Sequence, residues 1–316
     1  MSPTLRGLML TICVALAAAC GKAVDSAGDA DAAPGGDDGS DGADDDGSDD
    51  GGDDGAGDDG AEADAAPPGA GLIIASSTSF TDETGTLRES SFARAFFGDH
   101  ETESCVVEVE DPECRVLACT PRSPTKPFPD AGLIVIQGDT IDQVGLTPAV
   151  NGAYDAYGAD APLFEDGAEF SVFAAGADVP AFDVDLTAPF SIGFQGAVPT
   201  GSTQIAISAA AGHDMTWGGI EPNDTVHVTL SALPDGDNVR RVVDCSLAAG
   251  VGRLFFSSKV LSAMPQGNLD FEARVETSDT DLAGDYQVTF TASVVARVGG
   301  DDQTADAARG TMVLGE

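Results

Sequence analysis

The stretch that decides the fold is DTVHVTLSAL, at positions 224–233. Within it Val226, Val228 and Leu230 alternate with polar residues, so that every second side chain lies on the same face of an extended chain. The run FEARV at positions 271–275 repeats this alternation. A two-residue period of this kind predicts β-strands with one buried face.

Similar runs, bounded by turn residues at a spacing of roughly 8–15 residues, continue through the chain after position 70. They predict strands at Leu72–Ser77, Phe92–Phe97, Cys105–Val109, Arg115–Cys119, Leu133–Gln137, Glu169–Ala174, Phe182–Leu186, Thr203–Ile207, Thr225–Leu230, Val239–Leu247, Arg253–Ser257, Leu269–Thr277 and Tyr286–Val298. The only helical turn expected is at Val260–Met264. We therefore expect an all-β fold, with one or two antiparallel β-sandwich units after a disordered N-terminal region.

The folded part divides, on this interpretation, into a first β block at 71–190 and a second at 191–316. The stretch PAFDVDLTAPF, at 180–190, ends the first block. The second block has a strand containing Trp217, followed by DTVHVTLSAL and RRVVDCSL. This order resembles an immunoglobulin-like or fibronectin-like sandwich. The resemblance is one of architecture and implies no function.

The first 20 residues, MSPTLRGLMLTICVALAAAC, are typical of a secretory signal. Arg6 precedes a largely apolar run that is too short to span a bilayer as a helix. Its end, LAAAC followed by Gly21, resembles the bacterial lipoprotein signal, although Leu16 lies one position further from the cysteine than is usual. The resemblance implies that Cys20 becomes the lipid-modified N-terminus. The alternative is an ordinary secretory signal that leaves Cys20 as a free thiol.

A lipid on Cys20 would make the membrane a direct partner, because two or three acyl chains anchor a protein stably. Gly21, rather than Asp, follows the cysteine. The inner-membrane retention signal of enteric bacteria is therefore absent, and we expect residence at the outer membrane or the cell surface.

Residues 21–70 are predicted to be a disordered linker rich in Asp and Gly. Positions 25–64 hold 17 acidic side chains and no Lys or Arg, and few of the residues are apolar enough to be buried. A signal followed by such an acidic tether resembles the layout of many lipoproteins of myxobacteria and their relatives. The EF-hand ligand pattern does not occur in the linker, so we expect a spacer with only weak, non-specific cation association.

The charge of the folded part excludes one class of partner. The chain has a net charge of −40, and residues 71–316 hold 37 acidic and 12 basic side chains. Nucleic acid and anionic membrane surfaces are bound through basic clusters, so neither is expected to be a direct partner of this part.

The four cysteines after the linker predict disulfides, because their number is even and a secreted protein folds in an oxidising compartment. Four cysteines allow three pairings. We favour Cys105 with Cys119, across a hairpin that turns at 111–113, and Cys114 with Cys245, which would join the two blocks. A zinc site is the rival, but the spacing lacks both a close pair and a neighbouring histidine. No metal and no cofactor is predicted.

Catalytic motifs of the common hydrolase and phosphate-binding types do not occur, and no catalytic residue is predicted. His100, His213 and His227 do not cluster in the sequence, and alternation places His227 on a solvent-facing side of its strand. Trp217 is expected in the core. If it were exposed beside His213 and Asp214, its ring could stack on a sugar.

The leading hypothesis is a lipid-anchored envelope protein whose body is not an enzyme and serves a binding or structural role, with an unknown protein or glycan ligand. The alternative is an envelope carbohydrate-binding module or hydrolase that uses acidic residues and Trp217.

Overall fold

A computed structural model describes residues 69–81, 86–124, 127–138, 141–154, 157–201, 203–218, 224–298 and 306–316. The predicted signal with Cys20 and most of the linker lie outside the described residues. The first strand begins at Gly69, so the last two residues assigned to the linker belong to the folded body. The body is all-β, as predicted.

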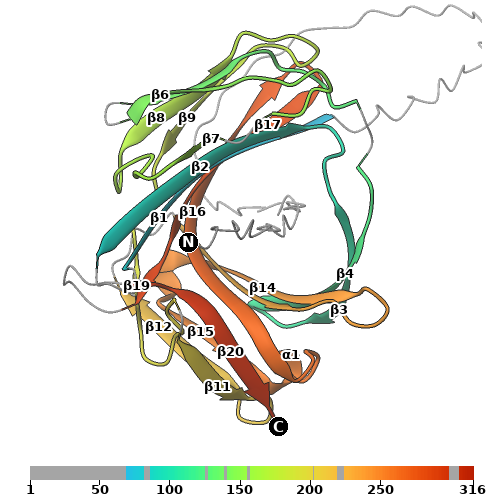
Figure 1. Cartoon of the computed structure of the whole chain (residues 1–316), viewed down its shortest axis with the longest axis vertical. Helices are drawn as coiled ribbons and strands as arrows, with labels where there is room; N and C mark the ends of the chain where they lie inside the picture. The colour runs from blue at the N-terminus through green and yellow to red at the C-terminus, as the bar shows by residue number, and fades with distance from the viewer. Residues whose placement is uncertain are drawn as a thin grey trace, which may run out of the picture. The chain divides into compact units, whose positions relative to one another are not determined.

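The largest sheet has 11 strands in the order β3-β4-β14-β13-β16-β17-β1-β2-β7, with β20 also beside β16 and β11 beside β20 (Figure 1). Its strands are β1 (Gly69–Thr81), β2 (Leu87–Phe97), β3 (Glu103–Glu110), β4 (Cys114–Pro121), β7 (Tyr157–Ala159), β11 (Gln204–Ser208), β13 (Thr225–Ala232), β14 (Arg240–Ala248), β16 (Gly267–Ala283), β17 (Tyr286–Val295) and β20 (Arg309–Gly315).

Two smaller sheets complete the body. One has the order β6-β5-β8-β9 and the other has the order β15-β12-β10-β18-β19. Their strands are β5 (Ile134–Gly138), β6 (Ile141–Leu146), β8 (Glu169–Ala174), β9 (Phe182–Thr187), β10 (Gly193–Gln195), β12 (His213–Gly218), β15 (Arg253–Phe256), β18 (Arg297–Val298) and β19 (Asp306–Ala307).

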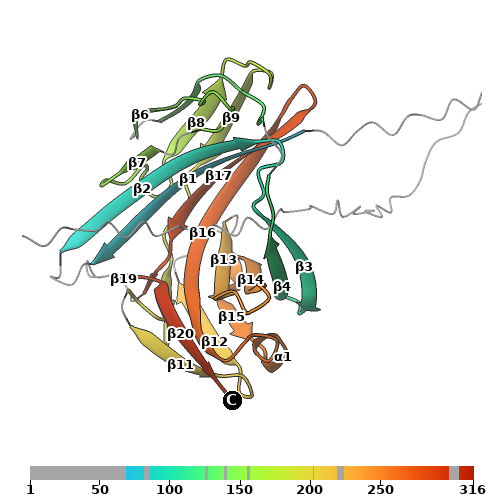
Figure 2. The same ribbon diagram turned by 45° about the vertical axis from the view of Figure 1, so that its right-hand side comes forward.

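One continuous cluster of buried side chains joins all three sheets. On β13 every second residue is buried, so Val226, Val228 and Leu230 face this core as their alternation predicted. The ring of Phe170 in the four-stranded sheet meets Phe290 of β17 edge-on, with centroids 5.2 Å apart. Figures 1 and 2 show this small sheet stacked against the large sheet near β17, while β12 and β15 lie near β20.

The pairing of β1 separates this fold from a purely antiparallel sandwich. β1 lies between β17, to which it is parallel, and β2, to which it is antiparallel. β11 and β20 are also parallel. The large sheet is therefore mixed.

The boundary drawn at 190/191 does not separate the sheets. The large sheet contains β1 to β4 and β7 from the first predicted block and six strands from the second. Residues 68–316 accordingly form one compact unit. Contacts between strands far apart in the sequence override the local break in composition, because a sheet is stabilised by whichever strands complete its core.

The strands that the sequence did not predict are mostly short or lie at the C-terminus, as β6, β7, β10, β19 and β20 do. The predicted helical turn overlaps α1 (Ser258–Leu261), whose N-terminus is capped by the Ser257 hydroxyl. A second turn, of the 3₁₀ type, forms at Ala249–Val251 and was not predicted. Among the described residues, no helix is both long enough and apolar enough to cross a bilayer.

Candidate functional site

A groove of about 990 Å³ lies between the four-stranded sheet and β16. Its acidic side chains come from β8, β9, β16 and the residue before β13. They are Glu169, Asp185, Asp224, Glu276 and Asp279. No Lys or Arg is among the described residues that line it. The groove is therefore suited to a ligand that carries positive charge or hydrogen-bond donors.

The groove exists because β13 is shorter than β16. The pairing of these strands ends where Thr225 lies opposite Glu276, while β16 continues to Ala283. Beyond Glu276 no described strand pairs with this side of β16. β9 crosses nearby, where the Thr277 hydroxyl donates a 2.7 Å hydrogen bond to the carbonyl of Thr187.

Asp224 and Phe190 shape one end of the groove. Asp224 is only 5% exposed, and its carboxylate accepts a 3.1 Å hydrogen bond from the Phe190 amide. Phe190 itself remains 39% exposed. Asp224 thus fixes the backbone at this end of the groove, and the exposed Phe190 offers a ligand an apolar surface.

Glu276 connects the groove to a row of charged side chains on the polar face of the large sheet. Its carboxylate lies 3.0 Å from Nε2 of His227 and also pairs with Arg274. Asp244, on β14 two strands from β16, forms a 2.8 Å ion pair with Arg115 of β4. These charges lie on neighbouring strands, so opposite signs meet across the sheet.

The solvent-facing position expected for His227 is only partly correct. The residue does point away from Val226 and Val228, but its side chain is 24% exposed. Burial lowers the pKa of His227, and this effect exceeds the rise caused by Glu276. Alternation identified the face, but the charged side chains of β16 determine how much of it remains open.

Trp217 lies in the core, as expected, and this removes the sugar-stacking arrangement. The residue is 5% exposed, its ring packs on Phe194 with centroids 5.3 Å apart, and Nε1 donates a 2.9 Å hydrogen bond to the Ala249 carbonyl. A buried ring with a satisfied donor cannot present a face to a sugar.

His213 and Asp214 do not converge with Trp217 on a ligand site. They are consecutive residues of β12, so their side chains point to opposite faces. Nε2 of His213 lies 2.9 Å from the Ala197 carbonyl, and burial lowers its pKa. Asp214 pairs with Arg253 at 2.8 Å on the exposed side.

The contacts of His100 are likewise with residues that do not line the groove. Its ring stacks on Phe96 at 4.9 Å between centroids, and Nδ1 lies 2.9 Å from the Gly98 carbonyl. The three histidines thus have three separate sets of partners.

Both favoured disulfides are confirmed. Cys105 bonds to Cys119 directly across the β3–β4 hairpin, and Cys114 bonds to Cys245 across the β4–β14 pairing. The hairpin turns at 111–113 as predicted. The register of the hairpin shifts between Val107, which lies opposite Leu117, and Val109, which lies opposite Val116.

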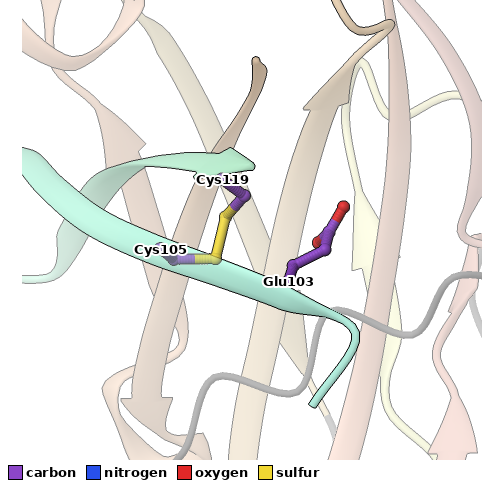
Figure 3. Close-up of side chains that lie close together, drawn as sticks. All are labelled: Glu103, Cys105 and Cys119. Atoms are coloured by element: carbon purple, nitrogen blue, oxygen red, sulfur yellow. A yellow bond between two sulfur atoms is a disulfide. The ribbon is translucent and has the colours of Figure 1, made fainter. Parts of the chain in front are cut away.

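One group of side chains in the described part has the spacing of a metal site. Ligand atoms of Glu103, Cys105 and Cys119 all lie within 4.8 Å of one another (Figure 3). The two sulfurs are joined as a disulfide, however, and a disulfide has no thiolate to offer a metal. Glu103 is instead paired with Arg240.

The groove was missed by sequence reasoning. With 37 acidic residues in 71–316, no local signal distinguishes the five that line it, because they come from four separate segments. No protein-family model matches the chain, and no curated protein matches it.

Proposed function

We propose that this chain is a lipid-anchored protein of the bacterial cell envelope, with a β body that acts without catalysis as a binding component. The proposal rests above all on Cys20, a cysteine that follows a signal-like segment directly and precedes an acidic spacer. The disulfides support it, because every cysteine in the described part is oxidised to a disulfide, as in secreted proteins.

The acidic groove is where we expect the body to bind its ligand. Its exposed carboxylates, on Glu169, Asp185 and Asp279, favour an envelope ligand that is rich in amines or hydroxyl donors, such as a basic protein segment or an amino-substituted glycan. An acidic surface would also keep the tethered body away from anionic lipid headgroups.

The carbohydrate-binding alternative loses its main residue, because the ring of Trp217 is packed in the core. Two phenylalanines line the groove, and of these Phe170 is buried while Phe190 is exposed. A carbohydrate-binding function would therefore require Phe190 to take the stacking role that was considered for Trp217.

Mass spectrometry of the mature N-terminus tests the anchor. We expect an acylated Cys20, membrane fractionation of the wild-type protein, and loss of both in Cys20→Ser. Cys13→Ser is the matched control and should keep both, because Cys13 lies in the part that is removed. A soluble mature protein with Cys20 unmodified or absent would refute the anchoring proposal.

Calorimetric titration with oligolysine and with a neutral oligosaccharide tests the groove. Asp185→Asn with Asp279→Asn should weaken oligolysine binding about tenfold, because two of the three exposed groove carboxylates lose their charge. Glu110→Gln with Glu113→Gln removes the same charge from the exposed hairpin and should change little. Equal weakening in both double variants would attribute the binding to net charge rather than to the groove. Binding of the oligosaccharide alone, lost in Phe190→Ala, would favour the glycan alternative.

A further inference from the structure

The two disulfides differ in their access to solvent. Cys105 is exposed on β3, the last strand at one edge of the large sheet, while its partner Cys119 has no exposed surface. In the other disulfide both residues are buried, with Cys114 5% exposed and Cys245 fully covered. A dissolved thiol can therefore approach the first disulfide from the side of Cys105 and cannot reach the second in the folded protein.

An ion pair lies beside the accessible disulfide. A carboxylate oxygen of Glu103 is within 4.8 Å of both sulfurs (Figure 3). Arg240 lies directly opposite Cys119 in the β4–β14 pairing and binds Glu103 through two contacts, of 3.1 and 2.5 Å. Because directly opposite residues project to the same face, the guanidinium and the carboxylate both lie on the side of the sulfurs. The two charges act in opposite directions on any negative charge that develops there.

We propose that Cys105–Cys119 is a thiol-exchange site, open to an external dithiol, and that Cys114–Cys245 is a permanent staple. This inference does not depend on the acidic groove. A thiolate of the dithiol attacks Sγ of Cys105, the bond between the two cysteine sulfurs breaks, and its electron pair leaves on Sγ of Cys119, which then takes a proton from water. The second thiolate of the dithiol attacks the mixed disulfide and releases Cys105. The protein disulfide is reduced and the dithiol is oxidised to a disulfide.

The neighbouring charges regulate this step. Arg240 stabilises both the incoming thiolate and the thiolate that forms on Cys119, while Glu103 opposes both. As long as they pair with each other, their effects largely cancel. The pair thus keeps the exposed disulfide at an intermediate reactivity.

Reduction leaves the hairpin attached to the body. The pairing of β4 with β14 and the Cys114–Cys245 disulfide hold its second strand. At its tip, the Ser257 hydroxyl donates a 2.5 Å hydrogen bond to Asp111, and Nζ of Lys259 donates one to the Glu110 carbonyl. The pairing of β3 with β4 and the Glu103–Arg240 ion pair also remain, so the hairpin keeps its place on the body.

The first experiment treats the folded full-length protein with dithiothreitol, alkylates the thiols at intervals and maps the labelled peptides. We expect Cys105 and Cys119 to be labelled at least about tenfold faster than Cys114 and Cys245, because the first pair is accessible without unfolding. Glutathione in place of the dithiol should form its mixed disulfide on Cys105 rather than on Cys119. Equal rates for the two pairs, or no labelling before unfolding, would overturn the proposal.

The second experiment compares two charge variants in the same assay. Glu103→Gln leaves Arg240 unopposed and should speed reduction about threefold to tenfold, while Arg240→Gln leaves Glu103 unopposed and should slow it by a similar factor. The rate at which Cys114–Cys245 is reduced in the same sample shows whether each variant stays folded. If loss of the ion pair merely loosened the hairpin, both variants would react faster, and the electrostatic control would be refuted.

Discussion

Cys114 and Cys245 lie directly opposite each other in the pairing of β4 with β14, and a disulfide joins them although 131 positions separate them in the sequence. The bond ties the hairpin of residues 103–121 to the centre of the large sheet. Both cysteines face the same core as Val228, which pairs with Cys245 from the other side. The disulfide is thus part of the core as well as a cross-link.

Removal of this staple should destabilise the protein more than removal of the hairpin disulfide. The loop closed by Cys114–Cys245 is the longer one, and chain-entropy estimates give about 5 kcal/mol for it against about 3 kcal/mol for Cys105–Cys119. Urea unfolding of the Cys114→Ser/Cys245→Ser and Cys105→Ser/Cys119→Ser variants measures the difference. A larger loss in the hairpin variant would contradict the expected order.

His227 should make stability depend on pH on the acidic side of neutrality. Its pKa is lowered in the folded protein because the ring is buried among Glu276, Arg274, Asp244 and Arg115. The unfolded chain then binds the proton more readily, so stability is complete above the unfolded pKa, near 6.5, and falls as the pH drops below it.

The matched variant for this effect is His227→Gln, which keeps a hydrogen-bonding side chain and cannot be protonated. The free energy of unfolding of the wild type should fall relative to the variant between pH 7 and pH 5. A parallel pH dependence of the two proteins would show that His227 does not carry the effect.

Trp217 should report on the core. It is the one tryptophan of the chain, so the native emission should have the short wavelength of a buried indole and shift to the red on unfolding. Trp217→Ala should cost about 3–5 kcal/mol, because it leaves a cavity against Phe194 and removes the hydrogen bond from Nε1 to the Ala249 carbonyl. Native emission typical of an exposed indole would contradict the buried position.

Tyr154 should stabilise the body through its hydroxyl group. The hydroxyl accepts a hydrogen bond from the Ala131 amide and donates one to the Gly132 carbonyl, both at 2.9 Å. Tyr154→Phe should cost about 1–3 kcal/mol, since the buried Ala131 amide loses its partner. Urea unfolding at neutral pH measures this loss, and an unchanged midpoint would contradict the role.

Alkaline pH gives a second measure of the same residue. Burial raises the pKa of the Tyr154 hydroxyl above its usual value. Its contribution is therefore complete below the unfolded pKa, near 10, and is lost as the pH rises beyond it. The absorbance of Tyr154 as tyrosinate should appear only with alkaline unfolding, and this step should be missing in Tyr154→Phe.

The strands and the disulfides show which features the local sequence pattern predicts correctly. The alternation of Val226, Val228 and Leu230 identified the buried face of β13. The spacing of Cys105 and Cys119 around a turn identified the register of the hairpin at that pair. In each case the relevant neighbours are close in the sequence, so the side-chain period and the turn are enough to specify the contact.

The order of the strands shows what the local sequence pattern does not specify. The parallel pairing of β1 with β17 joins residues more than 200 positions apart, such as Gly69 and Tyr286. Neither segment indicates by its sequence which strand it pairs with, because alternation specifies which face is buried and leaves open which strand lies beside it.

By itself, then, the sequence determined an all-β body with two disulfides and a core tryptophan, since these follow from residue type, period and short-range spacing. Only the tertiary structure decided that strands of both predicted blocks share one mixed sheet, and that five carboxylates from four segments line one groove. The physical reason is that strand order depends on the burial of the whole core, which sums contacts between distant segments. The positions of the acidic side chains follow from that order.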